Sequence, residues 1–415
     1  LGKNTNQVVI EIHGRERFEA EPGQVSVQAD GSYVSTATEV VSGQLSWTGQ
    51  GLVTASSGPG SAAVCFGINS ALDFLAAAAP SKEGYNDLTF ILRAPADLQA
   101  SDLHNSTWNM LLFETPAELI PQRDTNGYIY ELKGRSNFSL QSGSMVIDGK
   151  GAITGTMDGP FTASYSYAGN GQVNVTITPT GSSPFMVPFY INAGKDLMIG
   201  LMRVLSSEDN FQQVIILVRA PAIATPQDVQ GMWKLASFAT PNRLVLSKDS
   251  QNLLRDVVGK DDFETGSDSV VIGHDGFFVA NGGEPTIGTF SFGAGGSVTA
   301  TVTNLDGGAM SYAFKLNAAK NTMMAVRSDS SRNEMLVLTK APVVSQPRQD
   351  FGMAAVCRSG DIELFWASGV ERELQASTNL VDWVPVPGTQ GQHGYKAVIS
   401  SPGNTFYRVA ETADN

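Results

Sequence analysis

The sequence predicts an all-β protein with three tandem copies of one antiparallel β-meander module and a small C-terminal β domain. Three observations carry this prediction: a length of 415 residues, a glycine-rich composition with only 16% charged residues, and an internal repeat. A chain of this length is expected to fold as several domains. Short segments rich in Val, Thr, Ser and Gly are typical of strands and turns.

The repeat is clearest at the end of each copy, where a basic residue is followed by Ala-Pro. These endings place Pro95, Pro221 and Pro342 at intervals of 126 and 121 residues (221 − 95 and 342 − 221). The glycines of one turn recur in the same order, at Gly51, Gly171 and Gly296. Turns and strand ends that keep register together indicate duplicated modules.

The first copy lacks the opening strand of the other two. Residues 4–18 match residues 124–138 at a constant offset of 120, so the first copy begins about one strand late. Copies two and three open instead with segments that contain Trp108 and Trp233. A module without its first strand leaves an unpaired edge, which proteins normally cover or pair.

These boundaries divide the chain into four expected domains: an incomplete module over 1–97, β-barrel modules over 98–223 and 224–345, and a C-terminal domain over 346–415. Proline and polar residues after Pro342 are typical of a linker.

Alternating apolar residues predict about eight strands per complete copy, joined by short Gly- and Asn-containing turns. In the second copy the expected strands are 108–113, 128–132, 144–147, 161–167, 173–178, 185–191, 197–202 and 214–219. Consecutive strands of this kind favour an up-and-down barrel, which leaves no free edge. A β-propeller-like arrangement is the alternative.

The third copy opens with Gly231-Met232-Trp233 and ends its last strand at Lys340. This pattern resembles the lipocalin (calycin) family, in which a GxW strand is closed by a basic residue. The resemblance implies that Lys340 lies over the Trp233 indole as a structural barrel seal. The second copy offers Trp108 and Arg219 in the same places, although Ser106 stands where the pattern has glycine. Both tryptophans are expected in a core.

The last 65 or so residues have a different pattern, with Leu364-Phe365-Trp366, Trp383 and Phe406-Tyr407-Arg408. They resemble the small fibronectin-like terminal domain common on secreted proteins of verrucomicrobia and planctomycetes. That resemblance implies export, and hence an extracellular or cell-surface location. The start at Leu1, without Met or a leader, indicates a processed form or a fragment.

The only two cysteines are Cys65 and Cys357, too few for a disulfide framework. Two buried free thiols are the simpler interpretation. The alternative, if the protein is exported, is a disulfide across modules or subunits.

No pattern commits the chain to a chemistry. Its four histidines form no zinc motif, and no nucleophile elbow or phosphate-binding loop is present, so we expect no catalytic residue, cofactor or metal. The net charge of −13 opposes binding to nucleic acid. The longest apolar run, 74–79, is too short to span a membrane.

Three classes of function remain. A non-enzymatic structural protein that self-associates by strand or edge addition is favoured by tandem β-modules and the missing strand. The alternatives are a secreted array that binds glycans or small ligands, and an enzyme whose site the sequence does not reveal.

Overall fold

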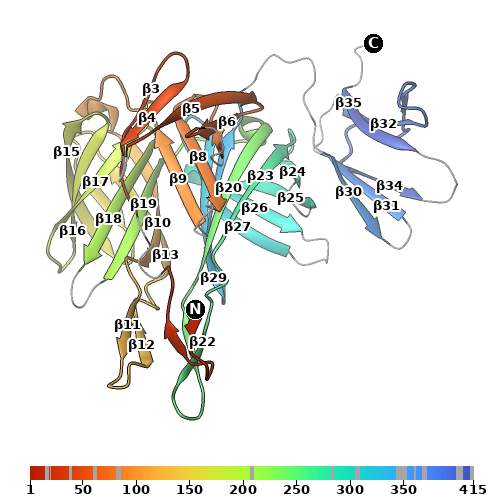
Figure 1. The fold of residues 1–415 in the computed structure, drawn as a ribbon. Helices are drawn as coiled ribbons and strands as arrows, with labels where there is room; N and C mark the ends of the chain where they lie inside the picture. The colour runs from red at the N-terminus through yellow and green to blue at the C-terminus, as the bar shows by residue number, and fades with distance from the viewer. Residues whose placement is uncertain are drawn as a thin grey trace.

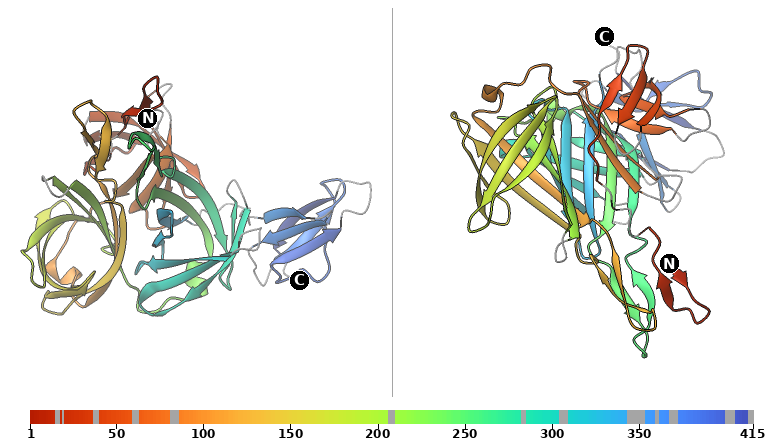
Figure 2. Two further views of the ribbon diagram at one scale, coloured as in Figure 1. Left: turned by 90° about the horizontal axis from the view of Figure 1, so that it is seen from below. Right: turned by 60° about the vertical axis from the view of Figure 1, so that its left-hand side comes forward.

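The computed structural model describes residues 1–14, 18, 20–36, 40–58, 63–80, 86–205, 210–281, 285–303, 309–342, 353–358, 361–366, 372–398 and 405–411. Three β-modules surround a common axis, with a narrow stalk at one end and the C-terminal domain at one side (Figure 1). Seen from below, the two closed barrels are adjacent rings and the first sheet lies beside both (Figure 2, left). The predicted all-β class is confirmed.

The second module is a closed antiparallel barrel of eight strands. Its core contains Trp108, Phe189 and residues from every side of the barrel. The strands are β10 (Ser106–Pro116), β13 (Ser139–Ile147), β14 (Ile153–Thr156), β15 (Pro160–Gly169), β16 (Gln172–Pro179), β17 (Phe185–Ile191), β18 (Leu197–Leu205) and β19 (Asn210–Arg219).

The third module repeats this barrel. Its strands are β20 (Gly231–Pro241), β23 (Glu264–Ile272), β24 (Phe277–Asn281), β25 (Pro285–Phe292), β26 (Ser297–Thr303), β27 (Ala309–Leu316), β28 (Thr322–Ser328) and β29 (Arg332–Lys340). A short helix α1 (Pro226–Val229) precedes it, and 3-10 turns η1 (Ala100–Asp102) and η2 (Ala294–Gly296) lie at the barrel ends. Since both complete modules are closed barrels, the propeller alternative is wrong.

One predicted strand is not a barrel strand. Residues 128–132 fall in a hairpin that leaves the barrel between its first two strands, and 153–156 supplies the eighth strand instead. Alternation of apolar residues predicted the strand correctly but could not identify its sheet, because a stalk hairpin also buries one face.

Three such hairpins form the stalk, one from each module. Their apolar residues share one core. Phe18, Phe138 and Phe263 form a triangle at its base, with ring centroids 5.7–5.9 Å apart. The hairpins are β1 (Gly2–Lys3) with β2 (Val9–Glu11), β11 (Ile120–Arg123) with β12 (Ile129–Lys133), and β21 (Val245–Lys248) with β22 (Leu254–Val258).

The first module is an open sheet of seven strands, which confirms that it lacks its opening strand. Its edges are β3 and β9, the equivalents of the two neighbours of β10 in the second module. The strands are β3 (Val25–Val27), β4 (Ser32–Thr36), β5 (Val40–Gly49), β6 (Leu52–Ser56), β7 (Val64–Ile68), β8 (Phe74–Pro80) and β9 (Asn86–Leu92).

The Ala-Pro endings and the turn glycines found in the sequence contact each other between modules. Pro95 packs on Gly171 and Pro221 packs on Gly296, while Ala341 at the end of the third module returns to Gly51 in the first. The three modules therefore close into a ring.

Buried side chains of the turn before each module's penultimate strand (β8, β18 or β28) close the same ring. Asp73 of the first module accepts hydrogen bonds from the Asn192 side chain (2.9 Å) and the Gly194 N–H (2.7 Å) of the second. Asp196 accepts in the same way from the third module, through Asn317 Nδ2 and the Ala319 N–H. Asn69 of the first module donates to the third, at Asn321 (3.2 Å).

Outer faces of all three modules meet on the axis inside this ring. Phe74 of the first module, Ile216 and Val218 of the second, and Met324 and Val337 of the third are buried in one cluster. A β-barrel normally exposes its outer face, so the ring provides apolar burial that a single module could not.

The C-terminal domain consists of two three-stranded sheets around Leu364, Trp366 and Leu374. It lies against the third module, where His393 Nε2 is 2.7 Å from an Asp275 carboxylate oxygen. Its strands are β30 (Met353–Arg358), β31 (Asp361–Trp366), β32 (Arg372–Ser377), β33 (Val384–Pro385), β34 (Gly394–Val398) and β35 (Phe406–Glu411).

Ring closure can be tested at Gly51, where an added Cβ would lie 2.6 Å from the Ala341 Cβ. Gly49 is the matched control, because both glycines have positive φ but a Cβ at Gly49 meets nothing within 4 Å. Both alanine variants carry backbone strain of about 1–2 kcal/mol. We expect Gly51→Ala to lose about 1–3 kcal/mol more in the free energy of unfolding, measured in urea, because it also overpacks the contact. Equal losses would argue against a tight closing contact.

Candidate functional site

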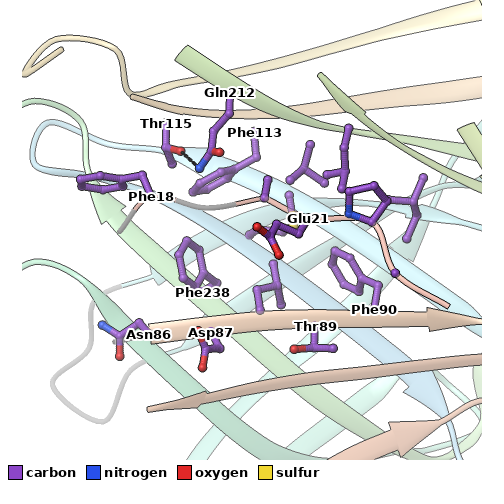
Figure 3. Close-up of a pocket in the computed structure, with 18 of the residues that line it drawn as sticks. Phe18, Glu21, Asn86, Asp87, Thr89, Phe90, Phe113, Thr115, Gln212 and Phe238 are labelled. Atoms are coloured by element: carbon purple, nitrogen blue, oxygen red, sulfur yellow. Dashed lines mark hydrogen bonds between the residues drawn. The ribbon is translucent and has the colours of Figure 1, made fainter. Parts of the chain in front are cut away.

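A groove lies where the opening strand of the first module is missing. It encloses a cavity of about 2510 Å³, well above the roughly 300–1,000 Å³ usual for small-molecule pockets. Residues from all three modules line it, as the close-up shows (Figure 3). The cavity is therefore larger than a small ligand needs.

One rim of the groove is the unpaired edge of β9. The Arg93 N–H donates to the Asp73 carbonyl (2.9 Å), so odd-numbered residues of β9 face β8 across the antiparallel ladder. The main-chain groups of Leu88, Phe90 and Leu92 therefore point toward the groove. Within the described part of the chain, β9 pairs with β8 alone.

Apolar side chains on this rim are less buried than their equivalents in the second module. Ile216 and Val218 are fully buried beside β10, whereas Phe90 and Leu92, their equivalents 126 residues earlier, are half-buried. The opposite walls supply Phe113, Phe238, Ile199, Val214 and Met335 from the axis, and Leu45, Val53, Ile68, Leu75 and Ile91 from the interior of the open sheet.

Polar groups mark the end of the groove nearest the stalk. Gln212 Nε2 donates to Thr115 Oγ1 (3.1 Å), and both side chains are at least nine-tenths buried. Gln212 Oε1 and the fully buried Thr240 Oγ1 have no hydrogen-bond partner among the described residues. Both oxygens are covered by neighbouring side chains, so a group in the groove could reach them only after these side chains move.

The other rim has lost part of its strand structure. In the second module, residues 139–143 of β13 are paired only with β10. Their equivalents around Glu21, Pro22 and Gly23 are not β-strand and run along the groove, and strand β3 begins only at Val25. The part of the strand that is missing is therefore the part that depended on the absent neighbour.

The residues predicted to seal the barrels lie opposite one another in register. Trp233 is directly across from Lys340, whose Nζ is 5.9 Å from the indole centroid and donates to the Asp228 carbonyl (2.7 Å). Trp108 is across from Arg219, which donates to the Asp102 carbonyl (3.1 Å). Both tryptophans are fully buried. The sealing role itself stays a prediction.

The cysteines do not define a site. Cys65 lies on β7 as an exposed free thiol, so the expectation that it is buried is wrong. Cys357 is on β30, and its side chain lies outside the described residues. The disulfide between them stays a prediction.

Among the residues that the structure describes, no three His, Cys, Asp or Glu side chains are grouped as metal ligands require. No described helix is long and apolar enough to cross a membrane. The buried carboxylates of the ring, Asp73 and Asp196, receive their hydrogen bonds from neighbouring turns and so serve the assembly of modules.

The sequence matches no established family profile and no characterised relative. Among solved structures it is similar to a double mutant of transferrin binding protein B from Haemophilus parasuis Hp5, at 10% identity over 78% of this chain and 65% of that chain, with a TM-score of 0.26. A single mutant of that protein gives 10% identity, 77% and 66% coverage and a TM-score of 0.25. A protein of unknown function from Nostoc punctiforme PCC 73102 is 8% identical over 59% of this chain and 100% of that chain, with a TM-score of 0.17.

This chain thus spans just under two thirds of the transferrin binding protein B chains, and TM-scores this low carry no argument about its function. The function has to be argued from the groove itself.

The sequence predicted an unpaired edge in the first module but not its place, and residues 8–12, near the start of that module, do not form it. Those residues belong to the stalk, where Val8, Val9 and Ile12 are buried. It also missed Leu88, Phe90, Gln212 and Thr240 as groove residues. The spacing Trp-x₄-Phe-x-Thr-Pro, shared by β10 and β20, marks the opening strand that the sequence shows to be missing from the first module.

The ring carboxylate of Asp196 predicts that the stability of the fold depends on pH. Burial raises the pKa of Asp196, and hydrogen bonds from Asn192, Ala319 and Asn317 offset this only in part. A raised pKa in the folded state favours the neutral acid, so Asp196 destabilises the fold increasingly as pH rises above the unfolded value of about 3.9. We expect the stability of the wild type relative to Asp196→Asn to fall as pH increases from about 4 to 7, in urea unfolding at each pH.

Asp148 is the control of opposite sign, because backbone hydrogen bonds from Ala152 and Lys150 lower its pKa. Relative to Asp148→Asn, the wild type should gain stability as pH rises above the folded pKa of Asp148. A pH-independent difference for Asp196→Asn would contradict the role of burial.

Proposed function

We propose that this protein is a non-enzymatic extracellular structural protein whose copies join by β-strand addition into the groove of the first module. The observation that carries the proposal is the open edge of β9, which faces a groove with apolar walls where the place of one strand is vacant. An extended segment placed there would satisfy the main-chain groups of Leu88, Phe90 and Leu92 and cover the apolar walls together.

The composition supports the extracellular part of the proposal. A chain of Gly-rich β-modules with only 16% charged residues, and with a terminal domain that resembles those of exported proteins, suits a surface location. The non-enzymatic part is supported by the two walls that the missing strand would cover, which are formed by apolar side chains of the axis and of the interior of the open sheet.

Addition between copies would be head to tail, because the donor and acceptor surfaces differ. Such a contact need not close on itself and can therefore propagate as a fibre.

The proposal is tested by Leu88→Pro, which removes a main-chain N–H that faces the groove. Proline is tolerated on an edge strand at such a position, so the module should still fold. We expect the native protein to form concentration-dependent oligomers in sedimentation velocity, and filaments or sheets in electron micrographs, that Leu88→Pro abolishes.

Leu88→Ala is the matched control, since it shortens the same side chain but keeps the N–H. It should retain oligomers, with weaker association. Native protein that stays monomeric at high concentration would refute assembly between copies.

A further inference from the structure

We infer that the groove is a specific acceptor for an extended strand of the form Trp-x₄-Phe-x-Thr-Pro, bound antiparallel to β9. The inference rests on the proposed function and deepens it, because it states the chemistry of the incoming strand. It is argued from the register of the two complete modules, the aromatic side chains on the axis and the partnerless polar atoms in the groove.

The register fixes where each residue of such a strand would lie. In the second module Trp108, Phe113 and Thr115 are opposite Arg219, Val214 and Gln212 of β19. The last strand of the first module, β9, and the Arg93 that follows it align with β19 at an offset of 126, and the Arg93 and Arg219 N–H groups bond equivalent carbonyls. The incoming Trp is then opposite Arg93, the Phe opposite Leu88 and the Thr opposite Asn86.

The Phe of the incoming strand would complete a set on the axis. Phe113 and Phe238 already contact each other in a T-shaped pair, with centroids 5.5 Å apart, and both line the groove. The equivalent place in the first module is vacant. In the stalk directly below, the third aromatic ring is present and all three rings touch. An aromatic side chain here buries a large area against two existing rings.

The Thr of the incoming strand would lie at the level of two covered polar atoms that lack partners, which it would reach once the Gln212 or Thr240 side chain rotates. Thr115 and Thr240 occupy this position in β10 and β20, and Gln212 Oε1 and Thr240 Oγ1 lack partners at this level of the axis. A hydroxyl can donate to one of these oxygens and accept from another group, whereas a methyl group of the same size cannot.

The alternate residues of the same strand face the interior of the open sheet. In β10 these are Trp108, Met110 and Leu112, all in the barrel core. In the first module some interior residues, among them Leu45, Leu75 and Ile91, are only partly buried. A strand with apolar residues at these alternate positions would close the sheet into a third barrel.

The full motif occurs twice in the sequence, at 108–116 and 233–241, and both copies are inside closed barrels. A copy of residues 1–415 could therefore donate this strand only by opening a barrel. In the assembly between copies, the occupant is therefore such a strand released from one barrel of a second copy, an exchange of identical elements between copies.

The test uses the whole chain and a labelled peptide of residues 231–241, GMWKLASFATP, with a scrambled peptide of the same composition as control. We expect saturable binding in fluorescence anisotropy, and slower hydrogen exchange at the amides of Leu88, Phe90 and Leu92. The Phe238→Ala peptide should bind roughly 30-fold or more weakly, because it loses a buried ring. The Thr240→Val peptide should bind about 3- to 10-fold more weakly, because it loses a hydrogen bond.

The outcomes separate this inference from the proposed function. Equal binding by the native, substituted and scrambled peptides would overturn the motif and leave strand addition standing. Monomeric native protein whose groove amides become protected by the peptide would overturn assembly between copies and support the motif. Absence of binding, with groove amides that exchange freely in the native protein, would overturn both.

Discussion

The arrangement of this molecule depends on the hydrogen-bonded ring of turns around its axis. A carboxylate or amide of one module accepts from the Asn side chain of the next, and the third module returns to the first. Buried polar groups are stable only when they are paired, so these turns fix the rotation of each module about the axis. With that rotation set, the outer faces of the modules meet in a shared apolar core and the three hairpins converge into one stalk.

The ring also explains how the groove can stay open. The second module contacts the first through Asn192 and Gly194 on Asp73, and through Gly171 against Pro95, neither of which requires the absent strand. The walls of the groove are thus held in place by turns. Its opening is lined by the residues that the strand would have covered. A rigid frame around a vacant place lowers the entropy lost when a strand binds.

A single chain with three similar modules is a covalent counterpart of a three-fold symmetric trimer. In a homotrimer every subunit has the same interface, so a vacancy would occur three times. Covalent linkage allows one module to differ, and here two barrels close while the sheet of the first module stays open. The exposed β9 edge would otherwise promote uncontrolled pairing, and confining it to a groove limits which segments can reach it.

The sequence by itself determined the repeat, the strand content, the burial of Trp108 and Trp233, and the lack of an opening strand in the first module, because each leaves a local periodic pattern. It could not assign residues 128–132 to the stalk or place the groove beside Phe90. Only the tertiary structure decided those points. It alone also showed the ring of turns and the groove walls formed by Phe113, Phe238 and Thr240. The physical reason is that alternation reports that one face of a strand is buried, whereas the identity of the covering surface depends on contacts between modules more than 100 residues apart.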